Sequence, residues 1–334
     1  MSKAQKVLIC GTNWLGDSVM SMPGVRMFRR MNPDVWVTML VRPAFGDLWS
    51  ATGDVDNVMI MGAGSVGTLR AAGAVRRCGF DECFVFPNSF RSALVPFLAG
   101  VPLRRGAAGH ARALMLTQVT GPAAPGTHQS GEYVGILGIH PTAGIPRPPY
   151  LKPSAADTAW ATGVLGQDSD CWVGMLPGAA RGPSKQWPAE HFSAVGRRLV
   201  REAGCRVAIF GSASELADCA GVCGSIGNGA VDFSGRTTLL QLAALLSRCR
   251  CVVSNDSGGM HLAAAVGVRV AAIYGITDHI VTGPMGDGHI IVADDGVIRG
   301  RDISPRSTAA QAALRGIHPD RVFIAARSIL EERR

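Results

Sequence analysis

Short apolar runs alternate with helical patterns along most of this chain, and this alternation limits the possible folds more than any other feature. In the first half, the predicted strands are residues 6–10, 35–41, 55–61 and 83–86. The predicted helices are residues 23–31, 65–77 and 89–99. Strands separated by helices are typical of βαβ units, in which helices cover both faces of a parallel sheet. The sequence therefore predicts an α/β fold.

The alternation is interrupted between Gly106 and Pro153. Stretches rich in glycine and proline at residues 121–126 and 146–149 flank one possible helix at residues 132–139. Such segments are typical of surface loops and of connections between domains. We predict a loop here, followed by an interdomain connection.

A second series of elements follows this interruption. Its predicted strands are residues 171–176, 206–210, 230–233, 251–253 and 268–274. Its predicted helices are residues 189–202, 214–223, 239–248, 260–266 and 320–333. We predict two Rossmann-like domains, residues 1–155 and 156–334, with parallel sheets facing a central cleft. The sequence leaves open whether the last helix packs back on the first domain.

Length and composition agree with two globular domains. The chain has 334 residues, of which 47% are apolar and 17% are charged. Its formal charge of +8 favours an anionic partner, which could be a nucleic acid, a nucleotide or a phosphorylated sugar lipid. Charge alone does not distinguish among these three partners.

The cysteine pattern and the lack of long apolar segments predict the cellular compartment of the protein. Nine cysteines, several inside apolar runs and without paired CxxC spacing, predict reduced core thiols in a cytosolic protein and no zinc site. The apolar run near the N-terminus, residues 7–10, is too short for a signal peptide. No apolar stretch reaches the length of a spanning helix, so any membrane contact is expected at the surface.

The first predicted strand leads into a glycine-containing turn, GTNWLGD, at residues 11–17. The dinucleotide fingerprint GxGxxG is absent, which disfavours an NAD site. Asp17 has two possible roles. It could cap the following helix through backbone N–H groups, or it could act as a general base that removes the proton of a sugar hydroxyl.

Two further loops follow strands of the second series. Residues 177–188, PGAARGPSKQWP, combine glycines with Lys185, which suits a diphosphate, although Arg181 and Lys185 could equally be ordinary exposed cations. Residues 254–261, SNDSGGMH, place small residues at a helix start, where backbone N–H groups favour an anion. The alternative is that Asp256 only caps this helix and His261 packs in the core.

Four blocks in the same order resemble the ADP-heptose:lipopolysaccharide heptosyltransferase family, glycosyltransferase family 9, and most of all its heptosyltransferase II branch. The blocks are residues 11–17, 87–97, 177–188 and 254–261. The resemblance implies the GT-B architecture of two Rossmann-like domains. It also implies inverting transfer of heptose from ADP-heptose to the heptosyl-Kdo–lipid A inner core of lipopolysaccharide.

The resemblance also implies roles for individual residues. Asp17 would be the general base, and Lys185 with Ser184 would hold the donor diphosphate. The rest of the donor pocket would be Asp256, Ser257, Gly258, Gly259 and His261. The acceptor side would be Asn13, Trp14, Asn88, Ser89 and Arg91. The expected enzyme binds no metal, cofactor or nucleic acid, and works at the cytoplasmic face of the inner membrane as a peripheral protein.

Three alternatives remain at this point. One is heptosyltransferase I, or another GT-B sugar-nucleotide transferase with a different acceptor. The second is a nucleotide-binding module without catalysis, and the third, supported by charge alone, is a nucleic-acid binder. Residues 283–314 match no block of the family, which leaves the adenine contacts unassigned, and the loop 106–149 leaves acceptor specificity unassigned.

Overall fold

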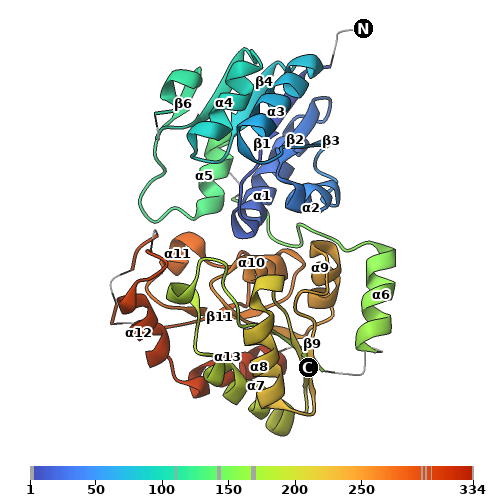
Figure 1. The fold of residues 1–334 in the computed structure, drawn as a ribbon, viewed down its shortest axis with the longest axis vertical. Coiled ribbons are helices and arrows are strands. Elements are labelled where there is room, and N and C mark those ends of the chain that lie inside the picture. Colours follow the sequence, from blue (N-terminus) through green and yellow to red (C-terminus); the bar gives the residue numbers. More distant parts are fainter. Residues whose placement is uncertain are drawn as a thin grey trace. The chain divides into compact units, whose positions relative to one another are not determined.

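The chain folds into two compact α/β units, Met1–Arg147 and Pro148–Arg334. The computed structural model describes residues 4–109, 111–140, 144–166, 171–294, 296–297, 299–301 and 303–332. Each unit contains one parallel sheet with helices on both faces (Figure 1). The predicted α/β class is confirmed.

The first unit contains six strands, which alternate with helices as the sequence predicts. The strands are β1 (Lys6–Cys10), β2 (Trp36–Val41), β3 (Asn57–Ile60), β4 (Glu82–Val85), β5 (Leu103–Ala107) and β6 (Gln118–Thr120). The helices are α1 (Leu15–Met31), α2 (Gly46–Ser50), α3 (Gly64–Cys78), α4 (Phe90–Leu98) and α5 (Gln129–Ile136), with 3₁₀ turns η1 (Pro43–Phe45) and η2 (Ala113–Met115).

The sheet of the first unit has the order β3-β2-β1-β4-β5-β6, and all its strand pairs are parallel. Helices α3 and α4 contact each other, and buried residues of both, such as Val75 and Val95, share one apolar cluster with the strands. Helices α1 and α5 form a second contacting pair. The inner sides of α3 and α4 are therefore covered by the sheet.

The second unit repeats this plan with six more strands. They are β7 (Trp172–Leu176), β8 (Arg206–Ile209), β9 (Ala230–Asp232), β10 (Cys251–Asn255), β11 (Val270–Tyr274) and β12 (Ile290–Ala293), in the order β12-β11-β10-β7-β8-β9. The helices are α6 (Ala155–Leu165), α7 (Ala189–Ala203), α8 (Leu216–Ile226), α9 (Leu239–Ser247), α10 (Gly258–Ala265), α11 (His279–Thr282), α12 (Thr308–Gly316) and α13 (Pro319–Glu331), with η3 (Pro183–Lys185) and η4 (Ala213–Glu215).

The boundary between the units lies at residues 147 and 148, earlier than the predicted position at residue 155. The extended segment after Pro148 belongs to the second unit because the backbone N–H groups of Tyr150 and Leu151 both donate to the carbonyl oxygen of Ala265. The last helix, α13, contacts α7 and strands β10 to β12 of its own unit. Its predicted last residue, Arg333, lies outside the described residues.

Several elements differ from the prediction. Helix α1 begins at Leu15 rather than at residue 23, because Pro23 lies inside the helix and not in its first turn. Strands β5, β6 and β12 and helices α2, α6, α11 and α12 were not predicted. No helix in the described part of the chain combines the length and apolarity needed to span a bilayer.

Candidate active site

Each sheet reverses its strand order at one place, and the loops at those two places carry the four sequence blocks. In the first sheet the reversal lies between β1 and β4, and in the second between β7 and β10. Ligands of open parallel sheets bind outside the carboxyl ends of the strands at such switch points. Blocks 11–17, 87–97 and 177–188 follow β1, β4 and β7, and block 254–261 begins in the last two residues of β10.

A pocket of about 280 Å³ lies at the switch point of the first unit. Its lining comes from the ends of β1, β2, β3 and β4, and the residues are Cys10, Gly11, Asn13, Trp14, Leu40, Arg42, Met61, Gly62, Pro87, Ser89, Arg91 and Ser92. The charged members of this lining are the two arginines, and no carboxylate belongs to it. The pocket therefore favours a ligand that carries negative charge.

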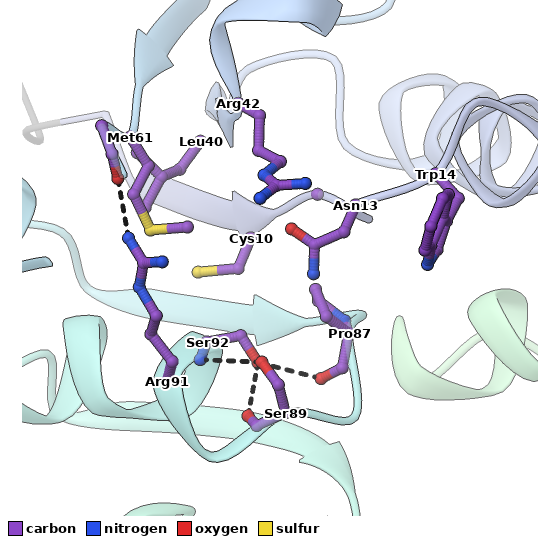
Figure 2. A pocket seen from close by; sticks show the side chains of 12 residues that line it. Cys10, Asn13, Trp14, Leu40, Arg42, Met61, Pro87, Ser89, Arg91 and Ser92 are labelled. Carbon is purple, nitrogen blue, oxygen red and sulfur yellow. Dashed lines mark hydrogen bonds between the residues drawn. The ribbon is translucent and has the colours of Figure 1, made fainter. Parts of the chain in front are cut away.

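Four of the five predicted acceptor-side residues line this pocket: Asn13, Trp14, Ser89 and Arg91 (Figure 2). Asn88 is not part of the lining. Its amide oxygen accepts a hydrogen bond from the guanidinium of Arg112 at 3.1 Å. Arg112 is fully buried and also donates to the carbonyl oxygens of Pro87 and Ala107. Asn88 therefore helps to fix the loop after β4.

The two pocket arginines are held differently. Arg91 donates through Nε to Oγ1 of Thr68 at 2.6 Å and through its guanidinium to the carbonyl oxygen of Gly62 at 2.7 Å, so it ties α4 to the start of α3. Arg42, which sequence reasoning missed, is exposed and follows β2 directly. Figure 2 shows its guanidinium close to Asn13 in that view.

Ser89 has a structural role beside its place in the pocket. It is the N-cap residue of α4, and its hydroxyl accepts a hydrogen bond from the backbone N–H of Ser92 at 3.3 Å. Such caps satisfy a backbone donor that the first turn of a helix cannot pair. Because Ser89 and Ser92 both line the pocket, this cap also fixes two pocket residues relative to each other.

Asp17 is not the cap of α1. Trp14 occupies the cap position, and Asp17 is the third residue of the helix, so the interpretation of Asp17 as an N-cap is wrong. An acid in the first turn is stabilised by the helix dipole, which favours the ionised carboxylate. Its Oδ1 accepts a hydrogen bond of 2.8 Å from Nε2 of Gln129, a residue 112 positions further along the chain.

Gln129 links Asp17 to helix α5. Its side-chain nitrogen also donates to the hydroxyl of Tyr133 at 2.8 Å, and both Gln129 and Tyr133 are buried. The orientation of the amide follows from chemistry, because an ionised carboxylate only accepts hydrogen bonds and must face the NH₂ group. The ring of Tyr133 packs against that of Phe86, with centroids 5.2 Å apart, just beyond β4.

In the second unit, the buried Asn255 holds both ends of the loop 177–188. Its Nδ2 donates to the carbonyl oxygen of Pro177 at 2.6 Å, and its Oδ1 accepts from the backbone N–H of Trp187 at 3.0 Å. The loop also packs closely on η4, since a Cβ atom on Gly178 would lie 1.9 Å from Oε1 of Glu215. Only glycine fits there without displacing that carboxylate.

Lys185 and Asp256, predicted to lie in one donor site, form an ion pair between η3 and the end of β10. Their side chains are 11% and 7% exposed. The interpretation of Lys185 as an ordinary exposed cation is therefore wrong. An ammonium group has three N–H donors, so this pairing leaves Lys185 able to donate to an anionic group as well.

The remaining predicted donor residues lie around the same ion pair. Ser257 is the N-cap of α10, so Asp256 is not the cap, and Gly258 and Gly259 form the first turn. Ser184 is buried in η3, and His261 is buried in α10. Sequence reasoning missed Tyr274, whose pKa is raised well above its ordinary value by burial and then by the charge of Asp256.

The described residues contain no group of three or more His, Cys, Asp or Glu side chains arranged to hold a metal ion. All nine cysteines have free thiols, six of them buried. Burial raises the pKa of Cys219 to about 12, which keeps it in the unreactive thiol form. The prediction of reduced core thiols agrees with these surroundings.

Two Rossmann-type units of identical strand order, with polar loops at both switch points, give the chain the GT-B fold. The pattern of Glycosyltransferase family 9 (heptosyltransferase) matches residues 68–297. The chain belongs to this family, so the resemblance based on the four blocks is confirmed.

Individual relatives agree with this assignment. The chain is 30% identical to lipopolysaccharide heptosyltransferase 2 of Escherichia coli (strain K12), over 98% of this chain and 97% of that protein. It is 29% identical to lipooligosaccharide heptosyltransferase 2 of Haemophilus ducreyi, over 95% and 97%. The solved structure of E. coli ADP-heptose lps heptosyltransferase II has the same fold, with a TM-score of 0.85, 24% identity and coverage of 98% and 99%.

Proposed function

We propose that this enzyme transfers heptose, with inversion, from ADP-heptose to the heptosyl-Kdo–lipid A inner core of lipopolysaccharide. The observation that carries the proposal is the chemistry at the two switch points. One holds an arginine-lined pocket and, three residues after the pocket residue Trp14, an oriented carboxylate, and the other holds a lysine beside a helix N-terminus. Inverting transfer uses a base for the incoming alcohol and positive groups for the departing diphosphate.

In the first unit, the acceptor heptose would bind in the pocket, with Asn13, Trp14, Ser89 and Arg91 as its contacts. Asp17 would take the proton of the acceptor hydroxyl as its oxygen forms a bond to the anomeric carbon of the donor. Gln129 would keep Oδ1 of Asp17 occupied and thereby orient the second carboxylate oxygen. The chain's own carboxylate thus supplies the base, and the proposal assigns no resident metal or cofactor.

In the second unit, the diphosphate of ADP-heptose would bind between the loop 177–188 and the N-terminus of α10. As the bond between the anomeric carbon and the diphosphate oxygen breaks, the electron pair leaves with ADP. Lys185 and the backbone N–H groups of the first turn of α10 would stabilise that charge. Asp256 would position Lys185 through the ion pair, and Ser184 and His261 would complete the pocket wall.

The acceptor is anchored in a membrane by lipid A, so we propose that the enzyme works as a peripheral protein at the cytoplasmic face of the inner membrane. The proposed alternative is heptosyltransferase I or another GT-B transferase, which would use a different acceptor. The difference lies in the number of heptoses that the acceptor already carries.

Mass spectrometry of acceptors incubated with ADP-heptose tests the proposal. Truncated acceptors with zero, one or two heptoses are incubated separately with the purified enzyme, and we expect a heptose to be added only to the acceptor that carries one. Addition to the heptose-free acceptor instead would support heptosyltransferase I. Intact donor with every acceptor would contradict transferase activity and favour a nucleotide-binding module.

A further inference from the structure

Exposed apolar side chains are concentrated in one segment of the first unit. Among the described residues, sixteen large apolar side chains are exposed, and eight of these lie between α3 and β6. The described residues of the second unit include four. Single exposed apolar residues are normal, but a concentration of this kind indicates an interaction surface.

Six of the eight side chains lie on three neighbouring elements, and we call their outer side the apolar face. It consists of Val66 and Leu69 on α3, Phe90, Phe97 and Leu98 on α4, and Leu114 on η2. Helix α4 contacts both α3 and η2, and α3 and α4 cover the same side of the sheet. Their outer sides are therefore neighbours in one layer.

The three α4 residues follow helical spacing. Phe97 and Leu98 follow Phe90 by seven and eight positions, which is about two helical turns, so the three side chains lie along one stripe of the helix. They are 50%, 44% and 41% exposed, and Leu114 in η2 is 92% exposed. Because the inner side of this helix already packs on the sheet, burial in the core does not account for the apolar stripe on its outer side.

The charged residues within the helices of this face are all basic. Helices α3 and α4 contain Arg70, Arg76, Arg77 and Arg91 and no acidic residue. The guanidinium of Arg104 lies over the ring of Phe97, with its central carbon 5.5 Å from the ring centroid. Residues 1–147 contain 14 Lys and Arg against 8 Asp and Glu, so most of the chain's net charge of +8 belongs to this unit.

The apolar face adjoins the pocket of the first unit at the start of α4. Phe90, half exposed, lies between Ser89 and Arg91, which both line the pocket. A partner that covers this face therefore lies next to whatever occupies the pocket.

We propose that the apolar face docks on an anionic lipid bilayer. Aromatic and aliphatic side chains enter the interface between headgroups and acyl chains, and arginines around them pair with lipid phosphates. The long stem of arginine can lie along the apolar layer while its guanidinium reaches the headgroups. The proposal rests on the proposed function in one respect, which is that the acceptor in the neighbouring pocket is itself a glycolipid of that bilayer.

Vesicle flotation with the full chain tests this proposal without acceptor or donor. The vesicles are phosphatidylcholine alone, or phosphatidylcholine with phosphatidylglycerol. We expect the wild-type protein to float with the anionic vesicles, to be released by added salt, and to float much less with the neutral vesicles.

Matched variants locate the surface. Leu69→Asp changes a side chain of the apolar face that is 62% exposed, and Ile324→Asp changes one on α13 that is 61% exposed. Arg76→Glu on α3 is matched by Arg315→Glu on α12, and both arginines are exposed. We expect the two α3 variants to bind anionic vesicles at least about fivefold more weakly. The two controls should bind as the wild type does, and melting temperatures verify that all four variants are folded.

Three results would overturn the proposal: no binding of the wild-type protein to anionic vesicles, equal losses in the control variants, or a dimer that Leu69→Asp dissociates while vesicle binding persists. The last result would make the face an interface between two copies of the chain. Turnover with a delipidated acceptor should be unaffected by Leu69→Asp. Absence of that turnover in the wild type would contradict the proposed function and leave the vesicle result intact.

Discussion

Asp17 combines a position in the first turn of α1 with a hydrogen bond from a buried amide. If it is the general base, Asp17→Asn removes proton transfer but keeps the shape of the side chain. We expect kcat to fall by about 10²–10⁴, with unchanged affinity for ADP-heptose by calorimetry. Turnover equal to that of the wild type would show that Asp17 is only a favourable first-turn acid.

Gln129 is expected to act through Asp17 as a positioning residue. Gln129→Leu keeps the volume but removes the donor, and we expect kcat to fall about tenfold to a hundredfold, since small displacements of a reacting group have effects of this size. KM for ADP-heptose should not change. Tyr133→Phe, which keeps the ring contact with Phe86, should give a smaller decrease.

The double variant Asp17→Asn/Gln129→Leu separates positioning from folding. If Gln129 acts only through the carboxylate, its replacement adds nothing once Asp17 is gone. Gln118→Leu, at an exposed glutamine of β6, is the matched control and should be silent. If Gln129→Leu lowers kcat by the same factor in the wild type and in Asp17→Asn, and also lowers the melting temperature, Gln129 has a structural role.

Lys185 is paired with the buried Asp256, so removal of the lysine is expected to affect both activity and stability. Lys185→Ala should raise KM for ADP-heptose and lower kcat by about 10²–10³, the usual effect of losing a group that stabilises developing charge. It also leaves Asp256 buried without this cation, so stability should fall. The variant Lys185→Ala/Asp256→Asn should recover stability but not activity. Recovery of both would show that the ion pair is purely structural.

At the scale of elements, most strands with apolar sequence were predicted, although the apolar run of β12 was overlooked. Strand β5 contains two arginines and a glycine, and β6 has three residues, so neither shows an apolar run. Helix α1 was predicted too short because proline is common in first turns, whereas Pro23 is tolerated inside this helix. The secondary structure of these elements depends on tertiary packing, which cannot be recognised from the residue pattern of a single sequence.

The candidate site was predictable where it consists of contiguous loops after strands. The blocks after β1, β7 and β10 were recognised because glycine, small residues and charges follow apolar runs, and the block after β4 was recognised only through the family resemblance. Gln129, Arg42 and Asn255 were missed because their roles depend on partners distant in sequence. Only the strand order brings the loop after β2 to the pocket, and only the packing of α5 on α1 brings Gln129 to Asp17.

The junction of β11 and β12 predicts a pH dependence of stability. Nδ1 of His289 accepts a hydrogen bond from the backbone N–H of Val270 at 3.1 Å, so Nε2 carries the proton and lies 3.0 Å from the carbonyl oxygen of Met285. Burial lowers the pKa of His289, and the hydrogen bond with Met285 opposes this only in part. The folded protein thus holds the neutral ring.

Because the folded pKa lies below the unfolded value, the unfolded chain binds a proton that the folded chain does not. The free energy of unfolding should therefore be highest above about pH 6.5 and fall below it, by at most about 1.4 kcal/mol per pH unit from this residue. Urea unfolding at about pH 7.5 and about pH 5.5 should show less pH dependence for His289→Gln than for the wild type. Equal dependence in His289→Gln and in the exposed-residue control His140→Gln would contradict this assignment.

At the scale of the whole molecule, the two units have the same strand order but different chemistry. The second unit has a large apolar cluster of its own, from Val173 to Leu330. We expect a fragment of residues 148–334 to unfold cooperatively and to bind ADP with the affinity of the full chain, without turnover. Calorimetry and urea unfolding measure both properties. A fragment 1–147 that binds ADP equally well would reverse the assignment of donor and acceptor.

The buried Asn255 affects the entropic cost of the proposed donor binding. Because one amide holds the loop 177–188 at both ends, much of the conformational entropy of that loop is lost during folding and not during the proposed binding of ADP-heptose. Less of the binding energy is then consumed in ordering the protein. Aspartate, although nearly the same shape, could not reproduce this preorganisation, since a carboxylate accepts hydrogen bonds but has no N–H to give to Pro177.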